Sequence, residues 1–390
     1  MQDILWLLLP LAAASGWYAA KRSARRMESS AKDHTPAYFK GLNFLLNEQP
    51  DKAIDVFVQM LEVDSETVET HLALGNLFRR RGEVDRAIRI HQNLIARPAL
   101  NRDHKAQALL ELGQDYMRAG LFGRAENLFS ELDEMNSHQE PALQNLLIIY
   151  QQEKDWEKCL QVANRLGQIS GRSLKPEQAH YYCELAEEAE VGGDMAQVMR
   201  CLKKAQSCDA DCVRATLLKG RLEIAQGDCG SAIQTLKVVE QQDVDYLPEA
   251  LPMLLECYRQ TGNREQLSDY LHQLHQRNQR IGPALELVNL IQADQNERSA
   301  LDFLTGYLQL HPDIEGIDRL IELSMKGLDG PAADTLQILR QLIEKLLAGR
   351  PGYQCNHCGF MAKTMHWQCP GCKSWSSIKP MDGLGDEKRR

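Results

Sequence analysis

A small residue recurs along most of this chain in pairs that are twelve positions apart. The clear pairs are Gly41 with Ala53, Gly75 with Ala87, Gly113 with Ala125, and Gly220 with Ala232. Weaker pairs keep the same phase: Leu147 with Cys159, Ala186 with Val198, Leu255 with Leu267, Val288 with Ala300, and Leu323 with Thr335. The interval between successive pairs stays between 33 and 39 residues. Self-similarity at such a period is typical of stacked repeats and constrains the fold more than any other feature of the chain.

The repeat predicts an all-α fold of helical hairpins. Leu, Ala, Gln, Glu and Arg are abundant and only 6% of the residues are aromatic, which favours helices over sheets. A period near 34 is that of the tetratricopeptide repeat, in which a small residue on each helix lets the two helices approach closely. We therefore expect about nine hairpins over residues 37–348, forming a superhelical solenoid. First helices should line its concave wall, which can hold an extended or helical peptide.

The repeat phase also suggests where a partner binds. Four polar residues of the early repeats should project from first helices into the concave wall. These candidate partner-binding residues are Asn76, Arg79, Gln114 and Arg118.

The N-terminal segment reads as a membrane anchor. Residues 4–20, ILWLLLPLAAASGWYAA, carry no charge and are followed at once by Lys21, Arg22, Arg25 and Arg26. Positive charge on that side alone places the N-terminus in the periplasm and the bulk of the chain in the cytoplasm. A cleaved signal peptide is the alternative, but such peptides carry positive charge before the apolar run, where this chain has only Asp3. We expect a transmembrane anchor at 1–20 and a basic, polar linker at 21–36.

The C-terminal region carries four cysteines with the spacing of a metal site. Two C-x-x-C pairs, Cys355 with Cys358 and Cys369 with Cys372, are separated by ten residues. The spacing predicts one tetrahedral four-thiolate site in a module at 349–380, followed by a polar tail at 381–390. Thiolates suit both iron and zinc, so the ion is left open. We expect Gly359 and Gly371 to supply the backbone freedom that the two turns need.

The four-cysteine module is too small to fold without its metal. We expect its aromatic residues to pack around the sulfurs; they are Tyr353, Phe360, Trp367 and Trp375. Only Gly349-Arg350-Pro351 separates the last predicted helix, 336–347, from the cysteine-bearing part of the module. The module is therefore also expected to cover the last apolar face of the solenoid.

Charge and motifs exclude several functions. A net charge of −9 gives no general reason to bind nucleic acid. The seven remaining cysteines are scattered singly, which suits a reducing cytosol. None of the common nucleotide-binding, hydrolase or metalloprotease motifs is present, so we do not expect an enzyme.

The chain resembles the lipopolysaccharide assembly protein B family of gamma-proteobacteria. The resemblance rests on the anchor ending Gly16-Trp17-Tyr18, the block LGNLFRRRGEVDRAIRIHQ at 74–92, and the pattern CGF…W-x-CP-x-C-x-x-W…IKP at 358–380. It implies a single-pass inner-membrane adaptor that regulates lipopolysaccharide biosynthesis by proteolysis. The implied partners are the membrane protease FtsH, the lipid A pathway deacetylase LpxC and other lipopolysaccharide synthesis or assembly proteins, with a homodimer left open.

The resemblance also implies a rubredoxin-like, zinc-ribbon terminal module whose ligands are Cys355, Cys358, Cys369 and Cys372. Compared with a full rubredoxin, the interval between the pairs is shorter here, and Lys373 replaces the glycine that usually follows the second pair. A structural role for the metal therefore fits better than electron transfer. Two alternatives to the adaptor stay open: a general membrane-tethered assembly scaffold for envelope proteins, and a rubredoxin-like redox carrier.

Overall fold

The computed structural model describes residues 39–41, 43, 44, 52, 56, 68–98, 100–326 and 328–381. The predicted anchor at 1–20, the linker at 21–36 and nearly all of the tail lie outside the described residues. So does most of the first predicted hairpin, including Ala53. Within the described part of the chain, no helix is both long and apolar enough to span a membrane.

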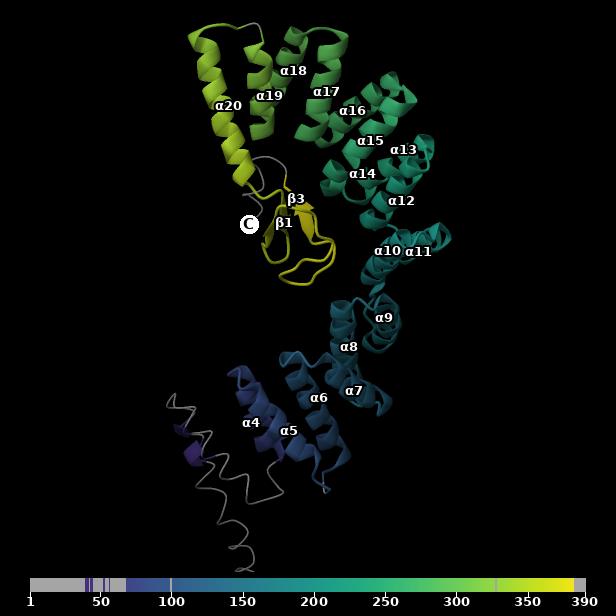
Figure 1. Ribbon diagram of the computed structural model, residues 1–390, viewed down its shortest axis with the longest axis vertical. Helices are drawn as coiled ribbons and strands as arrows, with labels where there is room; N and C mark the ends of the chain where they lie inside the picture. The colour runs from purple at the N-terminus through teal and green to yellow at the C-terminus, as the bar shows by residue number, and fades with distance from the viewer. Residues whose placement is uncertain are drawn as a thin grey trace, which may run out of the picture. The chain divides into compact units, whose positions relative to one another are not determined.

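The described chain is a succession of helices followed by a three-stranded knuckle, which confirms the predicted solenoid (Figure 1). The first helices of the repeats are α4 (Val68–Arg80), α6 (Arg102–Arg118), α8 (Gln139–Glu153), α10 (Lys175–Val191), α12 (Val213–Ala225), α15 (Leu247–Thr261), α17 (Ile281–Asp294) and α19 (Ile314–Met325). The second helices are α5 (Val84–Ile95), α7 (Phe122–Glu134), α9 (Trp156–Ser170), α11 (Met195–Cys208), α13 (Cys229–Lys237), α16 (Arg264–Asn278), α18 (Glu297–Leu310) and α20 (Pro331–Gly349). Two short elements, α14 (Val239–Gln242) and the 3-10 helix η1 (Val244–Tyr246), lie between α13 and α15.

The chain divides into two compact units at Lys154 and Asp155. Unit 1 holds helices α4–α8, and unit 2 holds α9–α20 with the knuckle, except that Gln168–Ser170 group with unit 1. Unit 2 contains the metal centre.

The paired small residues hold the two helices of a hairpin together, as the repeat predicts. A Cβ atom placed on Gly75 would lie 2.3 Å from Nε2 of His91, and one placed on Gly113 would lie 2.5 Å from Cε1 of Phe129. The corresponding atom on Gly220 would lie 2.6 Å from Cδ2 of Leu236. In each case the contacted side chain lies one helical turn after the paired alanine, and all three alanines are fully buried. These glycines therefore set the spacing between first and second helices.

Glycines with a left-handed backbone lie in the turns between the two helices of a hairpin. Gly82 follows α4 with a φ of 83°, and Gly120 follows α6 with a φ of 73°, a conformation that favours glycine. Four second helices, α9, α11, α13 and α18, begin with an Asp or Asn side chain that caps the helix. For example, Asp194 accepts a hydrogen bond from the backbone N–H of Gln197 at 2.9 Å. Short-range chemistry thus fixes where each hairpin turns.

The knuckle is built on three short antiparallel strands. They are β1 (Tyr353–Cys355), β2 (Met361–Ala362) and β3 (Ile378–Pro380), in the order β2-β1-β3. Tyr353 pairs with Ala362 on one side and with Pro380 on the other. The first cysteine of the site therefore lies on the central strand.

The last helix of the solenoid differs from the others. Helix α20 has no buried residue, and Thr335, which the repeat phase pairs with Leu323, is exposed. The final pair of the series therefore does not pack as the earlier ones do.

Candidate metal centre

The four cysteines form two turns with the same backbone hydrogen bonds. In the first turn, the N–H of Cys355 donates to the carbonyl of Phe360 at 2.8 Å, and the N–H of Gly359 donates to the carbonyl of Cys355 at 2.9 Å. In the second turn, Cys369 donates to the carbonyl of Ser374, and Lys373 donates to the carbonyl of Cys369, both at 2.9 Å. Each turn brings its two thiols to the same side.

The residue after each pair requires a left-handed backbone. Gly359 has a φ of 77°, and Lys373, at the equivalent place in the second turn, has a φ of 61°. Gly371 has no positive φ, so the expectation that it supplies the freedom of the second turn is wrong. The strained position is Lys373, which lacks the freedom of glycine.

The four sulfurs lie where one tetrahedral ion would bind. All four lie within 4.8 Å of one another. The Sγ atoms of Cys355 and Cys372 are 3.7 Å apart, and those of Cys358 and Cys369 are 3.6 Å apart. A tetrahedron with metal–sulfur bonds of about 2.3 Å has edges of about 3.8 Å, so these separations fit a bound ion. Within the described residues this is the one cluster of at least three metal-binding side chains.

The site has a buried side and a solvent side. Cys355 and Cys369 are buried, Cys372 is partly buried, and Cys358 is exposed. Hydrogen bonds from Ser374, first from its hydroxyl and then from its backbone N–H, lower the pKa of Cys372 to about 5. That thiol is therefore already suited to act as a thiolate ligand at neutral pH. The donor set accommodates iron or zinc.

The aromatic residues of the knuckle do more than enclose the sulfurs. Tyr353 packs beside the cluster, as expected, but Phe360 is exposed. The two tryptophans extend to the solenoid. The ring of Trp367 lies 5.2 Å from that of Tyr246, and the ring of Trp375 stacks on His180 at 4.9 Å.

The knuckle lies on the same side of unit 2 as α10 and η1 (Figure 1), and hydrogen bonds from both elements hold it there. Nε2 of His180, on α10, lies 2.7 Å from Oγ of Ser376. The hydroxyl of Tyr246, in η1, lies 3.1 Å from the carbonyl of Ser376 and 3.0 Å from that of Ile378. The knuckle backbone is therefore held from two helices that lie far from it in sequence.

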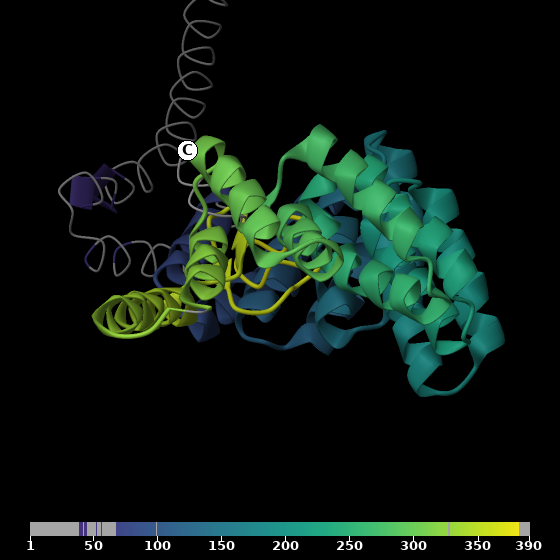
Figure 2. The same cartoon turned by 90° about the horizontal axis from the view of Figure 1, so that it is seen from above.

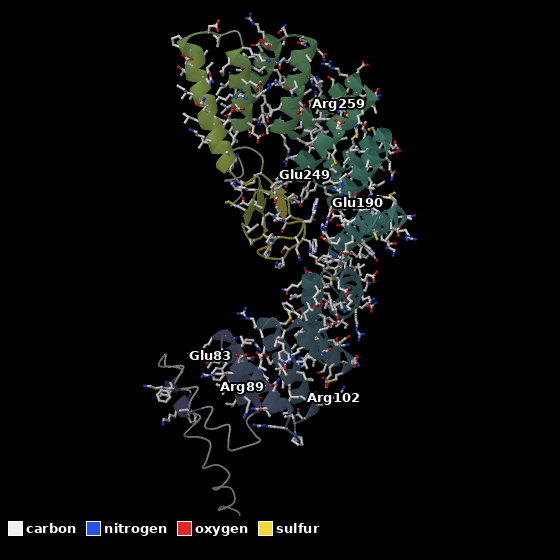
Figure 3. The ribbon with its side chains drawn as sticks, viewed as in Figure 1. Glu83, Arg89, Arg102, Glu190, Glu249 and Arg259 are labelled. Carbon is white, nitrogen blue, oxygen red and sulfur yellow. The ribbon has the colours of Figure 1, made fainter. Side chains whose placement is uncertain are left out.

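Charged groups complete this interface. The hydroxyl of Tyr353 donates to Oε1 of Glu249 at 2.7 Å, and Glu249 projects from α15 beside the knuckle (Figure 3). The ammonium of Lys379 pairs with Asp243 and lies 3.9 Å from the centre of the Tyr246 ring. The guanidinium of Arg214 lies 6.0 Å from the centre of the Trp367 ring.

Burial strongly perturbs His180. The residue is 3% exposed, and burial, assisted by the nearby charge of Arg214, lowers the pKa of His180 to about 3. Its imidazole is therefore neutral in the docked state at physiological pH. Sequence reasoning missed His180, Arg214, Tyr246 and Glu249, because each sits at an ordinary helical position with no motif around it.

The knuckle does not cap the end of the solenoid. Its contacts reach α9, α10, α12, η1 and α15, whereas four large apolar residues of α20 remain exposed. The expectation that the knuckle covers the last apolar face is therefore wrong. It occupies a wall lined mainly by first helices, where a peptide was expected.

The candidate partner residues lie in unit 1 and differ in their surroundings. Arg79 is not free: its guanidinium pairs with Glu111 at 2.6 Å and with Asp115 at 2.9 Å. Asn76 and Gln114 are partly buried, and Arg118, at the end of α6, is exposed. The guanidinium of Arg79 is therefore held by ion pairs within the solenoid.

Arg79 belongs to a buried network that joins three helices. Nδ1 of His91 lies 2.5 Å from Oδ2 of Asp115, and both side chains are fully buried. Asp115 thus connects α6 to Arg79 on α4 and to His91 on α5. This network stabilises unit 1 and was not apparent from the sequence.

Comparison with known proteins matches both parts of the fold. Residues 353–380 match the family described as "Rubredoxin metal binding domain", and residues 70–106 match "Tetratricopeptide repeat". Among solved structures, that of Naa15/Naa10 bound to HypK-THB aligns with a TM-score of 0.41 and 16% identity, over 81% of this chain and 47% of that one.

Curated relatives match along nearly the whole chain. Lipopolysaccharide assembly protein B of Escherichia coli K12 is 40% identical over 386 residues, which cover 98% of this chain and 99% of the relative. The protein of the same name from Haemophilus influenzae Rd is 35% identical, covering 98% of each chain. This chain belongs to the lipopolysaccharide assembly protein B family.

Proposed function

We propose that this chain acts in lipopolysaccharide assembly as a membrane-anchored, non-enzymatic adaptor. It would promote degradation of the deacetylase LpxC by the membrane protease FtsH and so restrain lipopolysaccharide synthesis. The observation that carries the proposal is the 40% identity over 98% of the chain to a protein named for lipopolysaccharide assembly. Repeat solenoids commonly bind other proteins on their extended surface. This fold therefore supports a role in bringing a protein substrate to the protease.

We propose different roles for the two units. In unit 2 the knuckle occupies part of the first-helix wall, so that part serves the fold of the chain itself. We therefore propose that partner binding uses unit 1, where Arg118 is exposed and Asn76 and Gln114 lie on the same two first helices as the network around Arg79. The metal would stabilise the knuckle and thereby the wall beneath it.

The anchor is part of the proposal. Confining adaptor and protease to the same membrane raises their effective concentration for each other. Deleting residues 1–20 should therefore weaken activity even if every repeat folds. We propose an inner-membrane location with the N-terminus in the periplasm and the repeats in the cytoplasm.

The test measures the half-life of the deacetylase in cells that lack this chain. The half-life should be long in the deletion strain, short when the full chain is restored at native level, and long again with a chain lacking residues 1–20. Affinity capture from membranes should recover the protease and the deacetylase with the full chain. An unchanged half-life in the deletion strain would reject the adaptor in favour of a general assembly scaffold.

The exposure of Cys358 favours examining a redox role as well. An electron carrier needs a metal near the surface, and one side of this site meets solvent. Purified protein with an iron-type visible spectrum and a measurable reduction potential would support that role. A colourless zinc form that shortens the deacetylase half-life fully would exclude it.

A further inference from the structure

A short segment of the knuckle contacts the cysteine turns on one side and the solenoid on the other. It runs from Ser374 to Ile378 and directly follows the second turn. The N–H of Cys369 donates to the carbonyl of Ser374 at 2.9 Å, and the N–H of Asn356, in the first turn, donates to the carbonyl of Ser377 at 2.8 Å. The segment therefore ties the two cysteine turns together.

Ser377 lies against one of the four cysteine ligands. Its Oγ atom is 3.4 Å from Sγ of Cys355, and both residues are buried. A thiolate ligand carries no proton, so the hydroxyl of Ser377 is the donor when an ion is bound. Hydrogen bonds of this kind orient a ligand, and their removal typically lowers metal affinity about ten- to a hundredfold. Ser377 is therefore placed to orient Cys355 and to stabilise its negative charge.

The solenoid holds the backbone on both sides of Ser377. The hydroxyl of Tyr246, in η1, lies 3.1 Å from the carbonyl oxygen of Ser376 and 3.0 Å from that of Ile378. These carbonyls belong to the residues immediately before and after Ser377, so one hydroxyl fixes the residue between them. Tyr246 is 1% exposed, and water therefore does not compete for this contact. Figure 2 shows the knuckle, in yellow, beside the green helices of unit 2.

The backbone of this segment is strained and depends on the contacts around it. Ser376 has a φ of 50°, a left-handed conformation that is unfavourable for a residue with a Cβ atom. Such a conformation persists only where the surrounding structure imposes it. Besides the contact with Tyr246, Oγ of Ser376 lies 2.7 Å from Nε2 of His180, and its N–H donates to the carbonyl of Trp367 at 2.8 Å. Without the two solenoid residues the segment would relax, and Ser377 would leave the sulfur.

We propose that Tyr246 is a positioning residue for the metal site: by fixing the backbone around Ser377, it keeps the hydroxyl of Ser377 on the sulfur of Cys355. Docking of the knuckle and binding of the metal then stabilise each other. By linkage, the ion strengthens docking by the same factor by which docking strengthens binding of the ion. The alternative is an independent knuckle, whose metal affinity does not depend on the solenoid.

The test measures the zinc affinity of the full chain in detergent micelles by competition with a chromophoric chelator. Zinc is the probe because it suits four thiolates and has no redox chemistry. Tyr246→Phe removes the hydroxyl and keeps the ring, and it should weaken zinc binding about tenfold. Ser377→Ala should weaken it by a similar factor. At saturating zinc, every variant should still hold one ion.

Tyr270→Phe is the matched control. Tyr270 is buried in the same apolar cluster as Tyr246, and its hydroxyl has no hydrogen-bond partner among the described residues. The control makes the same substitution in the same core but removes no contact to the knuckle. Its zinc affinity should equal that of the wild type.

Combining the two substitutions separates positioning from a general loss of stability. If Tyr246 acts through Ser377, the double variant should bind zinc within about threefold of Ser377→Ala alone, because the contact that Tyr246 supports is already gone. Helical content should be unchanged in all variants. A larger further loss in the double variant would show independent effects and overturn the proposal. So would wild-type zinc affinity in Tyr246→Phe, or an equal loss in Tyr270→Phe.

Discussion

The indole of Trp375 stacks on the imidazole of His180, with ring centroids 4.9 Å apart and planes 17° from parallel. The two residues are nearly two hundred positions apart in the chain, and their contact joins the metal knuckle to a first helix of the solenoid. The same indole lies edge-on to Tyr181 at 5.8 Å and to Trp156 at 6.3 Å. This aromatic cluster is the centre of the docked interface.

Replacing Trp375 by Ala should loosen the knuckle without removing its metal. Three aromatic contacts are lost, and a partly exposed aromatic group at such a contact contributes about 2 kcal/mol. We expect faster hydrogen exchange in α10 and η1 and unchanged metal content. Phe360→Ala is the control, since Phe360 is an exposed aromatic residue of the knuckle. Equal exchange rates in the two variants would contradict this role of Trp375.

Docking should weaken as the pH falls below about 6.5. Burial lowers the pKa of His180 in the folded protein to about 3, from its ordinary value of 6.5. The unfolded state therefore binds a proton first, and the stabilising contribution of neutral His180 is complete above pH 6.5 and declines towards pH 3. Across that window one extra proton corresponds to a slope of up to about 1.4 kcal/mol per pH unit.

The control for the pH experiment is His180→Phe, which keeps a ring for Trp375 but cannot titrate. Protonation of the cysteine ligands also destabilises the knuckle in acid, so the informative quantity is the difference in unfolding free energy between wild type and variant. That difference should shrink from pH 7 to pH 5. A difference that is constant over this range would show that His180 does not titrate in the transition.

Replacing Cys355 by Ser should remove the ion and unfold the knuckle, because a small module depends on metal for its stability. Limited proteolysis should then cut within 353–380, and the wall beneath the knuckle, around His180 and Tyr246, should become accessible. Helix α20 should keep its wild-type sensitivity, since the knuckle does not cover it. Ser299→Ala, on α18, is a control. A metal-free Cys355→Ser variant with native resistance would refute the prediction.

Reversing the charge of Arg79 should destabilise unit 1. Arg79→Glu would face Glu111 and Asp115 with like charge, and breaking a nearly buried ion pair costs about 3 kcal/mol. Arg118→Glu, at an exposed position, should change stability by less than about 0.5 kcal/mol. Thermal unfolding measures both effects. Because Arg79→Glu also destabilises unit 1, only Arg118→Glu tests partner binding without a change in stability. Equal melting temperatures for the two variants would show that the network around Arg79 contributes little.

The sequence by itself determined the features that depend on local spacing. Glycine and alanine twelve residues apart specify a helical hairpin, because each small residue faces the other helix at close range, as Gly75 and Ala87 do. Two C-x-x-C pairs specify a four-thiolate site, because each pair closes its own turn. These signals predicted the solenoid and the metal centre without knowledge of distant contacts.

Only the tertiary structure decided where distant parts meet. The contact of His180 with Ser376 spans 196 residues. It depends on how small rotations between repeats add up along the solenoid, which no periodicity in the sequence records. The ion pairs of Arg79 with Glu111 and Asp115, on the next first helix, are likewise a tertiary contact that the repeat phase did not predict. Large apolar residues of α20 also stay exposed, because the knuckle docks on other helices. The backbone at Lys373 likewise adopts a left-handed conformation because its turn copies that of Gly359, despite the residue type.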